Sequence, residues 1–199
     1  GAITGTDALT SLTATSSTAG ATVTLGTLVD ADSLTSLTLT GDYGNITMGS
    51  VGGAGSGENL ATVNLTASNG ATVSLNGNTI TADDVNSTTD LAMTLTATAG
   101  TSSTIETGTV TNTFGTITAN LTGPGTINSD GLTADDVTLT IASGGGTIDS
   151  ITATDDITIT AANTATTTIS AFDAGAATTG AISVTASGSG ALTFTNAVV

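Results

Sequence analysis

The sequence predicts an all-β protein, a right-handed parallel β-helix (β-solenoid) of about eight coils with three short strands per coil. Apolar residues alternate with Thr or Ser in short runs, which is the period of a strand with one face inward and one outward. Three such runs recur in the same order about every 20 to 30 residues, as expected of stacked coils. The apolar side chains are mostly Val, Ile, Leu and Ala, which fill a narrow tube well.

The repeating unit is clearest between residues 136 and 175. Runs 136–143, 144–150 and 151–156 form one cycle, and runs 157–162, 166–170 and 171–175 form the next. Each run alternates apolar residues with Thr or Ser and is bounded by small or acidic residues. Because each run is only a few residues long, each cycle fits one coil with a strand on each of three sides.

The same unit extends along the chain at a regular spacing. Asp32, Asp84 and Asp136 each open an alternating run, and they are 52 residues apart. New runs at Leu60 and Phe114 divide each 52-residue interval into two coils. The predicted coils are 7–31, 32–58, 59–83, 84–113, 114–135, 136–155, 156–178 and 179–199.

Turns and loops should absorb the differences in coil length. The Gly- and Ser-rich segments 52–57 and 100–106 are the expected bulges, and Pro124 between two glycines marks a turn. No stretch shows the 3.6-residue apolar period of a helix. A many-stranded β-sandwich has a similar turn spacing and remains the alternative fold.

The composition restricts the partners. There are 16 acidic residues with no Lys, Arg or His, so the net charge is −16. Nucleic acid is excluded on this segment because phosphate neutralisation needs Lys or Arg, and an anionic membrane surface would repel the chain. No apolar run approaches the roughly 20 residues of a spanning helix, so membrane insertion is not expected. The remaining partners are cations, neutral cell-envelope glycans and further copies of the chain.

Neither end of the chain shows the features that protect exposed strand edges from pairing with another chain. Residues 181–199 contain no charge, whereas exposed sheet edges are normally protected by charges, proline or a covering element. This predicts either a continuing chain or end-to-end assembly with another copy. Residues 1–199 are interpreted as a single solenoid domain, because the repeat continues without a linker. The chain begins at Gly1 without a signal-peptide pattern, which predicts that it is either a processed product or a fragment of a longer chain.

Paired aspartates are the candidate metal ligands. Residues one coil apart lie about 4.8 Å from each other, so carboxylates would stack along one corner with no cationic side chain to balance them. Ca²⁺ accepts six to eight oxygen ligands and is the natural counter-ion. The alternative is that each Asp forms an Asx-turn with its own backbone. The candidate calcium ligands are Asp83, Asp84, Asp135, Asp136, Asp155 and Asp156.

Other chemistry has little support. Without His or Cys, the Ser-His and Cys-His catalytic constellations are unavailable, and the chain is not expected to be an enzyme. Segment 52–60 approaches the calcium-binding nonapeptide Gly-Gly-x-Gly-x-Asp, but Gly57 stands where the aspartate should be. Thr-x-Thr steps such as Thr38–Thr40 and Thr158–Thr160 can form ice-binding arrays on solenoids. The variable coil lengths do not favour that interpretation here.

The composition and the alternating pattern of the chain resemble those of bacterial surface-layer and RTX-type secreted proteins. Segments 91–100 and 178–188, which combine Thr, Ala, Gly and Val, look like the β-solenoid lattice regions of those proteins. The likeness is compositional and covers most of the chain. It implies export, folding in extracellular calcium, and assembly into a lattice or fibre.

These observations together predict a structural, self-assembling extracellular or cell-surface protein, a surface-layer or filament subunit stabilised by calcium. The alternative is a stalk or passenger module of an adhesin that binds a glycan or a host surface. Clustered aromatic residues on a long loop would favour the adhesin, and the chain has none.

Overall fold

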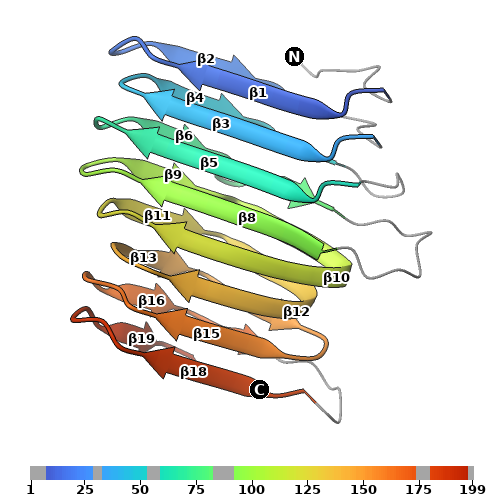
Figure 1. The fold of residues 1–199 in the computed structure, drawn as a ribbon, viewed down its shortest axis with the longest axis vertical. Helices are drawn as coiled ribbons and strands as arrows, with labels where there is room; N and C mark the ends of the chain where they lie inside the picture. The colour runs from blue at the N-terminus through green and yellow to red at the C-terminus, as the bar shows by residue number, and fades with distance from the viewer. Residues whose placement is uncertain (1–7, 29–32, 53–58, 83–91, 174–179, 197–199) are drawn as a thin grey trace.

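A computed structural model of the chain describes residues 8–28, 33–52, 59–82, 92–173 and 180–196. Within these ranges the chain forms strands and turns but no helix. The strands stack one coil below another along the long axis of the molecule (Figure 1). The predicted β-solenoid is confirmed, and the β-sandwich is wrong because every described pairing between strands is parallel.

Each coil crosses three faces. The front face, nearest the viewer in Figure 1, consists of β1 (Ser11–Ser16), β3 (Ser36–Asp42), β5 (Thr62–Ser68), β8 (Ala92–Ala99), the second halves of β10 (Thr109–Thr122) and β12 (Gly131–Ile141), β15 (Ile157–Ala161) and β18 (Ile182–Ala186). The back face is an eight-stranded sheet of β2 (Thr22–Leu25), β4 (Asn45–Met48), β6 (Thr72–Ser74), β9 (Thr104–Glu106), β11 (Thr126–Ser129), β13 (Gly145–Ile148), β16 (Thr167–Ile169) and β19 (Leu192–Phe194).

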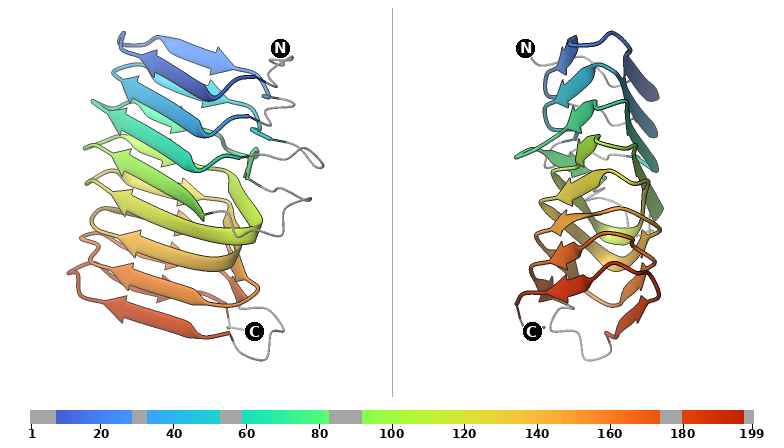
Figure 2. Two further views of the ribbon diagram at one scale, coloured as in Figure 1. Left: turned by 45° about the vertical axis from the view of Figure 1, so that its right-hand side comes forward. Right: turned by 90° about the vertical axis from the view of Figure 1, so that its left-hand side faces the viewer.

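The third, side face joins the back face to the front. It contains β7 (Thr79–Thr81), the first halves of β10 and β12, β14 (Ile151–Ala153) and β17 (Phe172–Asp173). Isolated bridges link Leu28 to Val51 and Val51 to Ile80, extending this face upward. Front strands run to the left in Figure 1 and back strands return to the right as the chain descends, so the winding is right-handed. Figure 2 shows the layers from two further sides.

The predicted coils correspond one to one with the strands of the back face, although the boundaries at 113/114 and 135/136 fall within β10 and β12. Eight strands stack on the back face, which corresponds to about seven complete turns, and each predicted coil contains one of them. The strands are not all short, however. β10 has 14 residues and β12 has 11, because each continues around the corner from the side face to the front face. A bulge between Asn112 and Thr116 makes the bend in β10, where the Asn112 side-chain Nδ2 donates to the Thr116 carbonyl at 2.9 Å.

Coil length varies while strand register is kept. Thr62 pairs with Thr94, 32 residues further on, whereas Thr118 pairs with Thr138, 20 residues further on. Segment 100–106 is not the bulge that we predicted, because only residues 100–103 turn and Thr104–Glu106 is β9. The predicted loop 52–57 lies largely outside the described residues.

The corner from front to back requires left-handed backbone conformations. Gly20, Gly123 and Gly144 have φ values of 76°, 94° and 73° there, and Tyr43 and Ser102 adopt 65° and 58°. Glycine takes this conformation without steric cost. At Gly123 a Cβ would lie 2.2 Å from the Ala99 carbonyl oxygen, so the coil above also excludes any side chain.

The core is a stack of columns of inward-facing residues. One column on the front face passes through Leu37, Val63, Leu95, Ala119, Leu139 and Ile159, each of which is at most 1% exposed. The strict alternation of buried and partly exposed residues in these strands confirms the period-two pattern. Near the last coil, the rings of Phe172 and Phe194 pack with centroids 5.0 Å apart.

Candidate functional site

The predicted aspartates that the structure describes lie at one corner, between the side and front faces. Asp135 and Asp136 are in β12, and Asp155 and Asp156 occupy the equivalent position in the next coil, between β14 and β15. Asp83 and Asp84, the other two predicted ligands, lie outside the described residues. The expected stacking of acidic pairs one coil apart is therefore present in the described pair of coils.

The carboxylates of this corner accept hydrogen bonds from the coil that follows. The Asp156 amide donates to Asp136 Oδ1 at 2.9 Å, and the Ala181 amide donates to Asp156 Oδ1 at 2.8 Å. Thr154 Oγ1 donates to Asp135 Oδ1 in the same way. These bonds cross from coil to coil, unlike the Asx-turn that we gave as the alternative. Asp136 and Asp156 thus satisfy backbone donors at a bend, and Asp135 satisfies a threonine hydroxyl.

Among the described residues, no group of three or more carboxylates is close enough together to hold a metal ion. Calcium at this corner remains a prediction. Two stacked carboxylates supply about two to four of the six to eight oxygens of a calcium shell, so backbone carbonyls and water would have to supply the rest.

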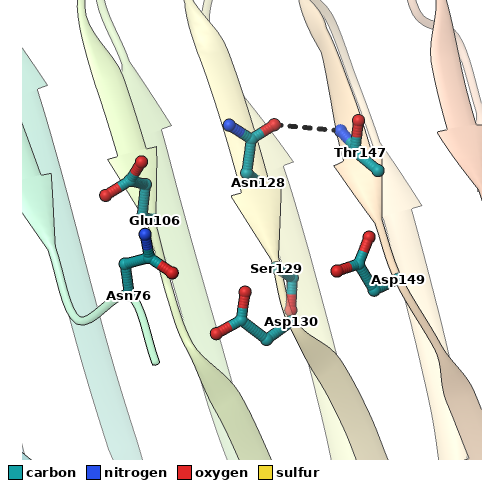
Figure 3. Close-up of a pocket in the computed structure, with 7 residues that line it drawn as sticks. All are labelled: Asn76, Glu106, Asn128, Ser129, Asp130, Thr147 and Asp149. Carbon is teal, nitrogen blue, oxygen red and sulfur yellow. Dashed lines mark hydrogen bonds between the residues drawn. The ribbon is translucent and has the colours of Figure 1, made fainter. Parts of the chain in front are cut away.

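A second acidic feature, which we did not predict, is a pocket of about 280 Å³ where the back face turns toward the side face (Figure 3). Neighbouring coils contribute to it, and the carboxylates of Glu106, Asp130 and Asp149 are arranged around it. The pocket is lined by Asn76, Glu106, Asn128, Ser129, Asp130, Thr147 and Asp149.

Parallel register brings these residues together. Ser74, Glu106, Asn128 and Thr147 are successive members of one outward column on the back face. Neighbours in such a column lie about 4.8 Å apart, so a short polar column forms although its members are 19 to 32 residues apart in the chain. Asp130 and Asp149 follow directly after β11 and β13.

Hydrogen bonds hold most of the lining in place. Ser74 Oγ donates to Glu106 Oε2 at 2.5 Å, and the Thr147 amide donates to Asn128 Oδ1 at 3.1 Å. The Gly77 amide, 53 residues before Asp130 in the chain, donates to Asp130 Oδ2 at 3.0 Å. The pocket is therefore a preformed, anionic, hydrogen-bond-accepting surface suited to a hydrated cation or to the hydroxyls of a neutral ligand.

A sequence signal for the pocket was present. Thr104-Ile-Glu106 and Thr126-Ile-Asn128 have the same Thr-Ile-acid-or-amide form, and Thr147-Ile-Asp149 repeats it two positions later, because Thr147 pairs with Asn128. We missed it because we assigned segment 100–106 to a loop. With β9 recognised as a strand, the first two triplets align residue by residue in adjacent coils.

The ends of the stack form a third feature. Residues of β18 and β19 that continue the inward columns are exposed, with Val184 at 42% and Phe194 at 41%. At the opposite end, Leu12 and Leu25 are only partly buried against the core. Both ends thus present apolar side chains beside strand edges that have one neighbouring strand each among the described residues.

Comparison with protein-family models, with curated proteins and with solved structures gives no match to this chain. Among the described residues, no helix is long and apolar enough to span a membrane. What the arrangement can do chemically is therefore argued from the three features above: the Asp corner, the pocket and the two ends.

Proposed function

We propose that this chain is a structural, self-assembling protein of the cell surface or extracellular space, whose copies stack end to end into a filament or lattice. The observation that carries the proposal is the exposure of core-facing residues in the last coil, Val184 and Phe194 above all. Exposed apolar side chains beside a row of unpaired backbone groups are a template for a further strand. A head-to-tail contact of this kind repeats without closing and generates fibres.

The two ends are complementary in pattern. β18 presents Val184 and Ala186 inward, and β1 presents Leu12 and Ala14 inward, each pair separated by one outward residue. Stacking β1 of a second copy below β18 would therefore continue the inward column that passes through Ile159. The buried apolar surface gained at the junction favours association by about 25 cal/mol per Å².

Charge does not oppose the junction itself. The terminal coils, residues 8–28 and 180–196, contain no charged side chain, whereas the whole chain carries −16. Except for Asp7, the acidic residues lie between these two segments in the sequence. Those that the structure describes are on the coils in between and would repel neighbouring copies sideways, an effect that salt screens over about 8–10 Å. We assign calcium the role of counter-ion for these carboxylates, at the Asp corner and in the pocket, because the chain has no cationic side chain to balance them.

The test is electron microscopy and sedimentation of the purified protein with millimolar calcium and with chelator. We expect filaments or sheets with calcium and shorter assemblies with chelator. Assembly that ignores the chelator would remove calcium from the proposal and leave the aspartates as hydrogen-bond acceptors. Dispersed monomers in both conditions would contradict self-assembly and favour the adhesin stalk.

A matched pair of variants locates the junction. Val184→Asp places a charge on the inward, exposed position of the last coil, and Thr185→Asp places the same charge on the outward position beside it. We expect Val184→Asp to abolish assembly and Thr185→Asp to preserve it, with both proteins keeping the circular dichroism spectrum of the parent. Equal effects of the two changes would count against the end-to-end junction.

A further inference from the structure

The front face carries a two-dimensional array of hydroxyl groups. Outward residues of successive strands pair in register and form three parallel columns across it. We call these columns the hydroxyl array: Ser11, Ser36, Thr62, Thr94, Thr118, Thr138, Thr158 and Ser183; Thr13, Thr38, Asn64, Thr96, Asn120, Thr140, Thr160 and Thr185; and Thr15, Thr40, Thr66, Thr98 and Thr122. Every member carries a hydroxyl except Asn64 and Asn120.

The regularity of the array was hidden in the sequence. The repeat length changes from coil to coil, between 20 and 32 residues, so Thr-x-Thr steps appear irregularly spaced along the chain. The structure aligns them because the front strands keep their register. Thr94 and Thr96, for example, pair with Thr118 and Asn120 in the next coil and with Thr62 and Asn64 in the coil before. The objection raised by variable coil length is thereby removed.

The array is free of charge although the protein is strongly acidic. The acidic residues that the front strands carry lie at its margins, Asp42 at one end of β3 and Asp136 at the bend of β12. The hydroxyl array also lacks aromatic side chains. Its ligand is thus uncharged, and a ligand that relies on stacking against aromatic rings does not suit it.

Most hydroxyls of the array are not used within the molecule. Among the described residues of the three columns, a hydroxyl–hydroxyl bond joins Thr98 to Thr122 at 3.0 Å, and we find no second one. Threonine is β-branched and stiff about χ1, so each side chain offers a hydroxyl and a methyl group in restricted positions. The array presents these groups to solvent in a fixed pattern.

The spacing of the array is set by the sheet. Columns repeat every two residues along a strand, about 6.6–6.8 Å, and neighbouring strands are about 4.7–4.9 Å apart. A surface with a fixed repeat in two directions and no recess recognises another surface with matching repeats. Hexagonal ice is such a surface, since its oxygen atoms repeat at distances close to both spacings and accept and donate hydrogen bonds.

We propose that the hydroxyl array of the front face binds ice. Its hydroxyls hydrogen-bond water molecules at the spacing of the ice lattice, and its methyl groups keep the intervening water ordered. Binding needs no change in the protein, because the array is held rigid by the buried columns behind it. This inference does not rest on end-to-end assembly, since stacking at the ends leaves the front face exposed.

The back face supplies an internal control. Its corresponding outward column contains Thr24, Thr47 and Ser74 but then Glu106 and Asn128. The charge of Glu106 and the pocket beside it interrupt the pattern. The outward column beside it contains Thr22, Asn45, Thr72, Thr104 and Thr126. Threonines on the back face therefore resemble those of the hydroxyl array in type and outward orientation, but they form a shorter array of two columns.

The experiment measures ice-crystal shape and thermal hysteresis of the purified protein by nanolitre osmometry. We expect faceted crystals and a gap between melting and growth temperatures. Thr118→Tyr, in the first column and about halfway along the stack of coils, should abolish both effects, because one bulky ring prevents close approach of a flat surface to the neighbouring coils. Thr47→Tyr, on the back face, should leave both unchanged. Aromatic residues suit exposed strand positions, so both variants are expected to fold.

Three outcomes would overturn the inference. They are round, freely growing crystals with the parent protein, equal loss of activity in both variants, and retained activity in Thr118→Tyr with an unchanged circular dichroism spectrum. Adsorption to a crystalline polysaccharide without any effect on ice would also overturn it. Thermal hysteresis measured under conditions in which the protein is monomeric would show that ice binding does not depend on end-to-end assembly.

Discussion

The middle of the solenoid and its last coil use the same sequence pattern with opposite results. In β12 and β15, Leu139 and Ile159 are at most 1% exposed, whereas Val184, the next member of their column in β18, is 42% exposed. All three residues point inward between outward Thr or Ser residues. The difference lies in the neighbours, because a middle residue is covered from above and below and a residue of the last coil from one side alone.

The comparison shows where the stability of a solenoid resides. Coils contribute through the interfaces that they share with their neighbours, so a terminal coil is held by half as many contacts as a middle one. The middle coils of this chain are also the most compact, with repeats of 20 residues and strands that continue around a corner. Matched substitutions in the two regions can therefore separate the effect of sequence from that of position.

The largest difference in the free energy of unfolding is expected when an inward side chain of the core column is shortened to alanine. Leu139→Ala should lower the free energy of unfolding by about 2–5 kcal/mol, because it leaves a cavity in a fully packed interior. Val184→Ala should cost about 1 kcal/mol or less, because 42% of the Val184 surface is already exposed and no coil packs on its other side among the described residues. Chemical denaturation of monomeric protein measures both values, and equal losses would show that the last coil is as well covered as the middle.

A smaller difference is expected at the corner glycines. Gly123→Ala places a Cβ 2.2 Å from the Ala99 carbonyl oxygen, whereas at Gly20 nothing lies within 4 Å. Both residues have positive φ, so each change incurs the left-handed penalty of about 1–2 kcal/mol, and Gly123→Ala adds a backbone clash. Thermal unfolding should place Gly123→Ala clearly below Gly20→Ala. A Tm for Gly123→Ala at or above that of Gly20→Ala would be inconsistent with close contact between coils at this corner.

The smallest changes in stability are expected at two buried threonines, and the two changes should have opposite signs. Thr107 Oγ1 donates to the Gly108 carbonyl at 3.1 Å, whereas Thr167 Oγ1, in the coil next to the last, is buried without a partner. Thr107→Val should therefore destabilise by about 0.5–1.5 kcal/mol, and Thr167→Val should stabilise by about 1 kcal/mol. Denaturant midpoints of the two variants report the sign. A stability loss in Thr167→Val would indicate that its hydroxyl is satisfied by water.

Much of the fold was predictable because the alternation of apolar and hydroxyl residues, and the point at which each coil begins again, can be read from short stretches of sequence. The run from Asp136 to Ser143 shows which residues point inward, and each expected coil proved to contain one strand of the back face. The misplaced feature was segment 100–106, where Gly and Ser at residues 100–103 suggested a long loop. The structure uses those residues for a tight turn and pairs Thr104–Glu106 with two neighbouring strands.

The candidate sites were less predictable because they depend on register. The aspartates of residues 135–136 and 155–156 were expected to stack, and they do, but the sequence did not show that Asp136 would accept a hydrogen bond from the Asp156 amide. The pocket around Glu106 was missed altogether. Its members come from coils of different lengths, so their proximity follows from pairing rather than from a fixed spacing in the chain.

The sequence by itself determined the class of the fold, the inward and outward faces of each strand, the net charge and the lack of Lys, Arg, His and Cys. These properties follow from residue type and a period of two. Tertiary structure alone decided which Thr-x-Thr steps align into the hydroxyl array, which carboxylates share the pocket, and which inward residues stay exposed at the ends. Those outcomes depend on contacts between coils, and unequal coil lengths conceal such contacts in the linear chain.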